Sequence, residues 1–74
     1  MLILNQEKTE LINLDRITFI SQEVDGDGDT LEYVAHGDEY TIHLGVYPNT
    51  QEQVNILEQI AERAGAVNIF QMPR

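Results

Sequence analysis

The stretch T-L-E-Y-V-A-H-G-D-E-Y-T-I-H-L-G-V-Y, residues 30–47, decides the fold, because apolar and polar residues alternate on both sides of its Gly37-Asp38 dipeptide. Such alternation is typical of β-strands that bury one face. A two-residue turn at the dipeptide places every apolar side chain of the two strands on one face, whereas a three-residue turn scrambles that face. The expected cross-strand pairs are Ala35 with Tyr40, Tyr33 with Ile42, and Leu31 with Leu44.

Shorter β-prone runs lie on either side of this hairpin. Leu2 to Asn5 and Thr9 to Asn13 predict a first hairpin. After a corner at Leu14-Asp15, Arg16 to Val24 predicts the longest strand. Ala66 to Gln71, near the end of the chain, predicts one more short strand.

The segment between these last strands has the punctuation of a helix. Asn49 or Thr50 can act as the N-cap, and Glu52 or Gln53, three residues later, can complete a capping box. Gly65 is the expected C-terminal cap. The apolar residues in between recur at helical spacing: Val54, Ile56, Leu57, Ile60, Ala61 and Ala64.

These elements predict an α+β fold in a single domain that spans residues 1–74. The expected architecture is a small antiparallel β-sheet of five to six strands in a meander, with one amphipathic helix, about residues 50–64, packed on it. A chain of 74 residues buries only about 60% of the surface that it exposes when unfolded, so the core is expected to be thin.

Charge is the most informative feature of the composition. The chain has thirteen acidic and four basic residues, and its formal net charge is -9. No Lys or Arg lies between Arg16 and Arg63. Because such a surface repels phosphate, we expect that it binds neither nucleic acid nor an anionic membrane directly. We expect the partner to be a protein.

Cysteine is absent, and no apolar run approaches the roughly 20 residues that cross a bilayer. Disulfides, thiolate metal sites and Cys nucleophiles are therefore excluded. The N-terminal M-L-I-L-N lacks the basic segment and long apolar run of a signal peptide. We expect a soluble, cytoplasmic protein.

The segment D-G-D-G-D-T-L-E, residues 25–32, resembles the front half of an EF-hand calcium loop. Asp25, Asp27 and Asp29 supply carboxylates at loop positions 1, 3 and 5, but Thr30 stands where the sharp bend needs Gly, and His36 stands where a bidentate Glu is required. A Gly- and Asp-rich turn between two strands explains the same residues. Weak Ca²⁺ binding stays open as an alternative.

Other side chains give no catalytic or metal site. In the predicted register His36 and His43 are offset by four residues, about 13 Å, which is too far for a shared zinc ion. We expect them to pair with Glu39 and Glu32 across the strands. Ser21 is the only serine and lacks a Gly-rich elbow, with nothing that places a His and an acid beside it. We therefore expect no enzyme, no catalytic residue and no cofactor.

Surface residues remain as candidates for binding. One candidate is a single acidic face, and another is Tyr47, which precedes Pro48 and could anchor a partner if it is exposed rather than part of the core. Open strand edges also make a homodimer as plausible as a monomer. The residues of the acidic face are Asp25, Asp27, Asp29, Glu32, Asp38 and Glu39.

Three segments carry a resemblance to known sequences: L-I-N-L-D-R-I-T-F-I (11–20), L-G-V-Y-P-N-T-Q-E-Q-V-N-I-L-E-Q-I (44–60) and I-F-Q-M-P (69–73). These segments resemble a group of short uncharacterised proteins of Gram-positive bacteria and their phages. The shared motifs are an I-N-L corner, a G-x-Y before a T-x-E helix start, and a terminal aromatic-x-Met-Pro. Phe70 stands where the group often has Tyr. The resemblance implies a bacterial or phage origin and no particular activity.

Three functional hypotheses follow. The first is a non-enzymatic interaction module that binds a protein, or itself, through a sheet edge or its acidic face. In the second, the acidic surface imitates nucleic acid and inhibits a host defence or DNA-binding protein, in which case binding should be fast and sensitive to salt. The third is a weak calcium-binding module.

Overall fold

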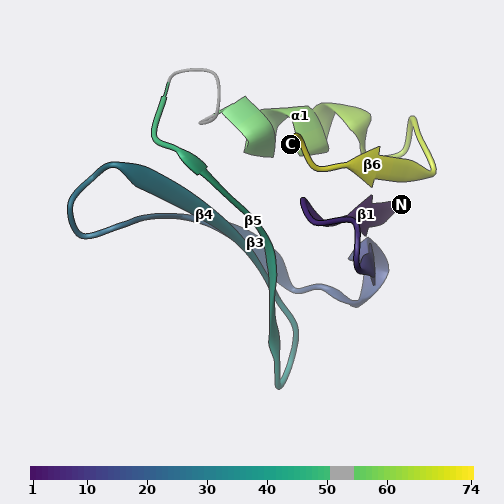
Figure 1. The fold of residues 1–74 in the computed structure, drawn as a ribbon. Helices are drawn as coiled ribbons and strands as arrows, with labels where there is room; N and C mark the ends of the chain where they lie inside the picture. Colours follow the sequence, from purple (N-terminus) through teal and green to yellow (C-terminus); the bar gives the residue numbers. More distant parts are fainter. Residues whose placement is uncertain (51–54) are drawn as a thin grey trace.

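A computed structural model describes residues 1–50 and 55–74, and within them six strands and one α-helix form an α+β fold (Figure 1). The predicted fold class is therefore confirmed. The elements are β1 (Leu2–Leu4), β2 (Leu11–Asn13), a 3-10 turn (Leu14–Arg16), β3 (Phe19–Val24), β4 (Thr30–His36), β5 (Thr41–Pro48), α1 (Ile56–Arg63) and β6 (Ile69–Gln71).

The strands form two sheets and not one antiparallel meander, so that part of the prediction is wrong. One sheet has the order β2-β1-β6 and the other β3-β4-β5. β6 pairs with β1 in parallel, with Ile3 opposite Phe70. The physical reason is burial, since this pairing brings Phe70 into the same core as Ile3 and Ile12.

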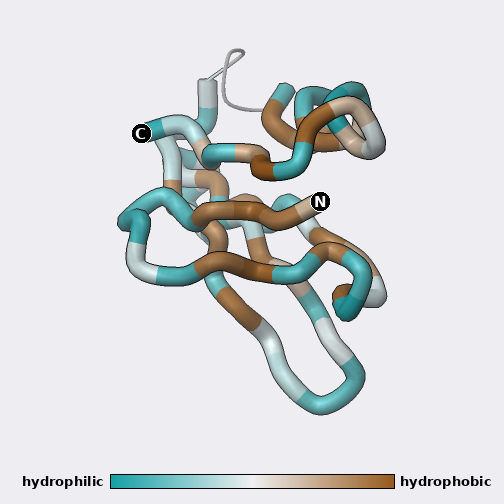
Figure 2. Tube along the Cα trace, turned by 90° about the vertical axis from the view of Figure 1, so that its right-hand side faces the viewer, coloured by the Kyte–Doolittle hydropathy of each residue, from teal (hydrophilic) through white to brown (hydrophobic). Residues whose placement is uncertain are grey.

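One hydrophobic core lies between the two sheets and the helix. Ile56 and Ile60 bring α1 into this core, which confirms that the helix packs by one face. The Tyr33 and Tyr47 rings meet edge to face at 5.8 Å, a favourable geometry for aromatic pairs. In Figure 2, β1, beside the N label, is a hydrophobic segment of the β2-β1-β6 sheet, which is the smaller sheet because its strands have three residues each. The buried cluster consists of Ile3, Ile12, Leu31, Tyr33, Ala35, Leu44, Tyr47, Ile56, Ile60, Phe70 and Met72.

The β4–β5 hairpin forms as predicted, but its turn is longer than two residues. Ala35 faces Ile42 and His36 faces Thr41, so the loop spans residues 37–40. Gly37 N–H donates to the Tyr40 carbonyl over 2.9 Å and closes this loop. Compared with the prediction, the partner of Ala35 changes by two residues, from Tyr40 to Ile42. Because side chains alternate with a period of two, Ala35 and Ile42 still point to the predicted face of the sheet.

A β-bulge interrupts the β4–β5 pairing between Tyr33 and Val34. Beyond it Tyr33 faces Gly45 and Leu31 faces Tyr47. Leu44 is the extra residue of the bulge, and it reverses the alternation of side chains in β5. Val46 therefore points outward with 51% of its surface exposed, while Tyr47 is buried. The pairing of Leu31 with Leu44 and of Tyr33 with Ile42 is therefore wrong.

The first hairpin and the end of the helix agree with the sequence. β1 and β2 pair antiparallel, and the loop between them is held by the buried Asn5 side chain, which accepts from Thr9 N–H at 2.9 Å and Glu10 N–H at 3.1 Å. Gly65 has a φ of +83°, as its capping role requires. In the structure α1 begins at Ile56 and its N-cap is Asn55, not the predicted Asn49 or Thr50. Glu52, Gln53 and Val54 lie outside the described residues.

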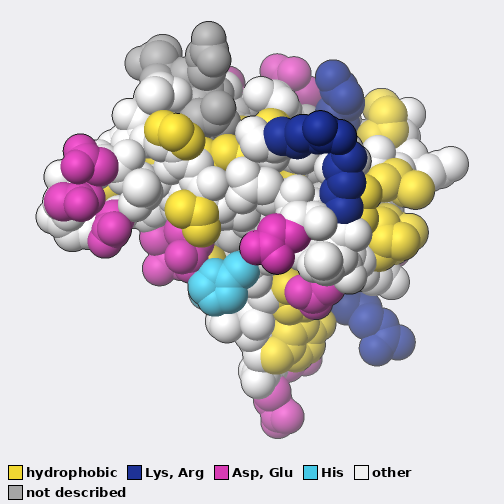
Figure 3. All heavy atoms as spheres, viewed as in Figure 1, with side chains coloured by type: hydrophobic (Ala, Val, Ile, Leu, Met, Phe, Trp, Pro, Cys, Tyr) yellow, Lys and Arg dark blue, Asp and Glu magenta, His cyan; other side chains and the backbone are white. Residues whose placement is uncertain are grey.

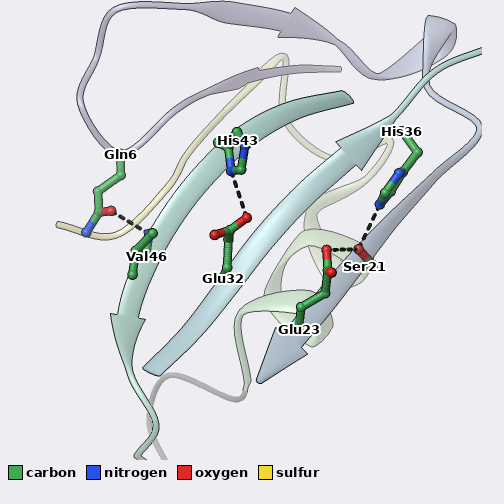
Figure 4. Close-up of polar contacts among 7 residues, drawn as sticks. All are labelled: Gln6, Ser21, Glu23, Glu32, His36, His43 and Val46. Carbon is green, nitrogen blue, oxygen red and sulfur yellow. Dashed lines mark hydrogen bonds and ion pairs between the residues drawn. The ribbon is translucent and has the colours of Figure 1, made fainter. Parts of the chain in front are cut away.

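Gln6 joins the β1–β2 loop to β5. Its backbone N–H donates to the Leu44 carbonyl at 2.7 Å, and its side-chain Oε1 accepts from Val46 N–H at 2.8 Å (Figure 4). Gly45 lies between these two contacts, and a Cβ atom there would stand 2.8 Å from the Tyr47 ring and 3.0 Å from the Gln6 Cβ. The close approach of the loop to β5 therefore requires a glycine at this position.

We predict that Gly45→Ala lowers the free energy of unfolding by about 1–3 kcal/mol, because the added methyl group overpacks the contact with Tyr47 and Gln6. Gly26→Ala is the matched control, since a Cβ at Gly26 meets nothing within 4 Å, and we expect a change below about 0.5 kcal/mol. Urea unfolding followed by circular dichroism measures both. Equal urea midpoints for the two variants would contradict the close approach of Gln6 and the Tyr47 ring to Gly45.

Candidate functional site

The outer face of the β3–β4–β5 sheet carries a group of polar side chains. Leu31, Tyr33 and Ala35 of β4 point into the core, so the alternate residues of β4 and their partners point away from it. Figure 4 shows five of these side chains over the three strands: Ser21 and Glu23 of β3, Glu32 and His36 of β4, and His43 of β5.

Ser21 contacts both a histidine and an acid, contrary to the prediction that nothing would place them beside it. The Ser21 Oγ lies 2.8 Å from His36 Nε2 and 3.1 Å from Glu23 Oε2 (Figure 4). Phe19, which faces His36 across the strands, stacks on the imidazole with the ring centroids 4.2 Å apart. The cause is the β3–β4 register, which pairs Phe19 with His36 and Ser21 with Val34.

The geometry of this trio differs from that of a catalytic triad. In a triad the acid holds the histidine, and the histidine takes the proton of the serine. Here Glu23 contacts the Ser21 hydroxyl instead of the imidazole. Because a hydroxyl has one proton, Ser21 can donate to Glu23 only when His36 Nε2 carries a proton and donates to Ser21. The arrangement is suited to holding β3 against β4 and not to activating a nucleophile.

The second histidine forms the cross-strand pair that we predicted. His43 Nδ1 lies 2.7 Å from Glu32 Oε1. The predicted pair of His36 with Glu39 is wrong, because the longer turn places Glu39 in the loop while His36 contacts Ser21. In the two described segments, no three His, Asp or Glu side chains are grouped so that they could hold a metal ion.

The six carboxylates of the predicted acidic face lie in different places. Asp25, Asp27 and Asp29 belong to the loop between β3 and β4, whereas Asp38 and Glu39 belong to the loop at the other end of β4. The seven residues of β4 separate the two loops by about 20 Å. Figure 3 accordingly shows acidic side chains both at the left-hand end and at the lower tip of the molecule. Glu32 lies between them on β4.

Hydrogen bonds inside the D-G-D-G-D loop favour its interpretation as a turn. Asp25 Oδ1 accepts from Gly26 N–H at 2.7 Å, and Asp27 Oδ1 accepts from Asp29 N–H at 2.9 Å. Gly28 has a φ of +80°, which a glycine adopts without strain. The Asn49 side chain donates to the Gly28 carbonyl at 2.7 Å and ties the loop to the end of β5.

A shallow hollow of about 330 Å³ lies on the outer face beside this loop. Its acidic walls are Glu23, Asp25 and Glu32, and its apolar wall is Val46, about half exposed; Val24 and Thr30 complete the lining. Among the described residues, no basic side chain lines it. The hollow is therefore suited to a cationic side chain that also carries apolar carbon atoms, as Lys and Arg do.

The two edges of the β3–β4–β5 sheet differ. Gln6 covers the middle of the β5 edge with its backbone and its side chain. β3 is the strand at the other edge, and no backbone hydrogen bond from elsewhere in residues 1–50 or 55–74 reaches residues 19–24. The sequence holds the signal for this open edge, since F-I-S-Q-E-V contains no Pro or Lys to block pairing.

Tyr47 is buried, with 2% of its surface exposed, so its predicted role as an exposed anchor is wrong. Its hydroxyl donates to the Pro73 carbonyl at 2.5 Å. The bulge at Leu44 reverses the alternation of β5 and so turns this ring into the core. Burial, assisted by the nearby Tyr33, raises the pKa of Tyr47 to about 12.

Comparisons with protein-family models, with curated proteins and with solved structures give no match. The resemblance to short proteins of Gram-positive bacteria and their phages therefore stays a prediction. Within the described residues, no helix has the length and apolar character that crossing a membrane requires.

We predict that folding stability decreases between pH 10 and 12 because of Tyr47. The phenol of an unfolded chain has a pKa of about 10, and the folded value is about 12. As the pH rises, the unfolded state loses its proton first, so this contribution is complete below pH 10 and is lost toward pH 12. Urea midpoints measured across this range should fall less for Tyr47→Phe than for the wild type.

Tyr40→Phe is the matched control, because Tyr40 is 46% exposed. It should keep the alkaline loss of stability that the wild type shows. An equal fall in Tyr47→Phe and in the wild type would contradict the assignment to Tyr47.

Proposed function

We propose that this protein is a non-enzymatic interaction module, of bacterial or phage origin, that binds a protein through the β3 edge and the acidic hollow beside it. The observation that carries the proposal is the asymmetry of the β3–β4–β5 sheet. The β5 edge is covered by Gln6, whereas β3 is an edge strand next to the hollow.

An edge strand recognises a partner by main-chain hydrogen bonds, and neighbouring pockets select its side chains. A partner strand added to β3 would pass Glu23 and Val24, which line the hollow together with Asp25 and Glu32. A Lys or Arg side chain of that strand can enter the hollow, where the negative charges favour its approach. The partner that best fits is thus an extended segment with a basic residue.

The hypothesis of nucleic-acid mimicry has less support. The carboxylates lie at both ends of β4, about 20 Å apart, whereas duplex DNA presents one charge per roughly 1.7 Å of its axis. The hypothesis of calcium binding has less support because Asp25 and Asp27 each use a carboxylate oxygen to accept a hydrogen bond within the loop.

Capture from a bacterial lysate tests the proposal with a pair of variants at one position. Gln22→Pro removes a β3 N–H, and the side-chain hydrogen bond that Gln22 accepts from Tyr33. Gln22→Ala loses the same side-chain bond but keeps the N–H. We expect the wild type and Gln22→Ala to retain the same protein, identified by mass spectrometry, and Gln22→Pro to lose it, because proline blocks an added strand.

Equal capture by Gln22→Pro would contradict binding at the edge, provided that thermal unfolding shows both variants to be folded. Repeating the capture at high salt separates mimicry from strand addition. A captured nucleic-acid enzyme that salt and added duplex DNA both release would support mimicry instead.

A further inference from the structure

We propose that the partner at the β3 edge is a second copy of this chain, and that the two β3 strands pair antiparallel about Gln22 to form one six-stranded sheet. This inference rests on the proposed function, because it uses the same edge, and the basic residue of the partner segment is then Arg16, which precedes β3. It assigns the occupant, the direction of the strands and their register, and each of these follows from a separate observation.

The free edge of β3 is identified by its bonding pattern. Asp25 N–H donates to the Thr30 carbonyl at 3.0 Å, in the same register that pairs Glu23 with Glu32 along β3 and β4. Bonded pairs in an antiparallel ladder recur at every second residue. The backbone groups that face β4 are therefore those of Phe19, Ser21 and Glu23, and those that face outward are Ile20, Gln22 and Val24.

The register follows from these three outward-facing residues. If Gln22 lies opposite Gln22 of the second copy, then Ile20 lies opposite Val24, and all three residues form bonded pairs. Centring the pairing on Ser21 or Glu23 leaves one of the three without a partner. Centring on Glu23 also places like charges directly opposite each other, which is unfavourable.

The side chains fit the same register. Ile20 and Val24, which is 55% exposed, would face each other on one side of the sheet. On the other side Ser21 would lie opposite Glu23 of the second copy, where a hydroxyl can meet a carboxylate. The net charge of -9 opposes association of two copies, but β3 itself contributes only Glu23.

The charges at the two ends of β3 fix the direction. Arg16 lies just before the strand, is exposed, and has no ion pair within the described part of the chain. The loop with Asp25, Asp27 and Asp29 follows the strand directly. Antiparallel pairing brings Arg16 of each copy to the acidic loop of the other, whereas parallel pairing brings acidic loop to acidic loop.

The remaining edges are less suited to a second copy. Gln6 occupies the middle of the β5 edge. β2 and β6, the edge strands of the smaller sheet, have only three residues each, whereas β3 has six. Because main-chain pairing grows with strand length, β3 offers the most hydrogen bonds to a second copy.

Disulfide cross-linking tests the register, because the chain has no cysteine of its own. In a bonded antiparallel pair the Cα atoms are about 5.5 Å apart, within the range of a disulfide. Gln22→Cys should therefore form a covalent dimer under mild oxidation. Ser21→Cys and Glu23→Cys are the controls, because their like residues would lie about 8 Å apart, beyond that range.

Sedimentation equilibrium tests the association and its charges. The wild type and Gln22→Ala should dimerise as the concentration rises, and Gln22→Pro should stay monomeric. Arg16→Glu should weaken the dimer about tenfold, and Arg63→Glu, which changes the net charge equally but lies on α1, should weaken it much less. Asp27→Lys combined with Arg16→Glu should restore the dimer.

A wild-type protein that stays monomeric at every concentration its solubility allows would overturn this inference. So would preferential cross-linking of Ser21→Cys or Glu23→Cys, or equal effects of Arg16→Glu and Arg63→Glu. The proposed function would still stand if Gln22→Pro alone lost a captured partner in the lysate experiment. It would fail only if capture were unaffected by the proline.

Discussion

The burial of Leu31, Tyr33 and Ala35 along one face of β4 is the constraint on which the rest of the structure depends. All three side chains are fully buried, and β4 is the central strand of its sheet. Because alternate residues of a strand point to opposite sides, burial of these three directs Glu32 and His36 outward. The polar outer face is therefore a direct consequence of how the core is filled.

The sequence predicted the elements better than their assembly. Alternation around Gly37 located β4 and β5, and the helical spacing before Gly65 located α1. The parallel partnership of β1 with β6 was not predictable, because three-residue strands carry no signal for their neighbour. The bulge at Leu44 was also missed, since the alternating pattern of β5 carries no sign of an extra residue there.

The candidate site shows the same division. The pairing of His43 with Glu32 was predicted, because it needed only the approximate register of one hairpin. The contact of Ser21 with His36 was missed, because it needs the register between β3 and β4, which the long D-G-D-G-D connection does not fix. The burial of Tyr47 was missed because the bulge reverses the alternation that predicted Val46 to be inside.

The parallel pairing of β1 with β6 has a consequence for how the chain is made. Ile3 and Ile12 share their core with Phe70 and Met72, so the β1–β2 hairpin is covered by residues that lie much later in the chain. Contacts this distant in sequence form late, because a large loop has to close before they can contribute. During synthesis the β1–β2 hairpin thus stays uncovered until β6 has left the ribosome.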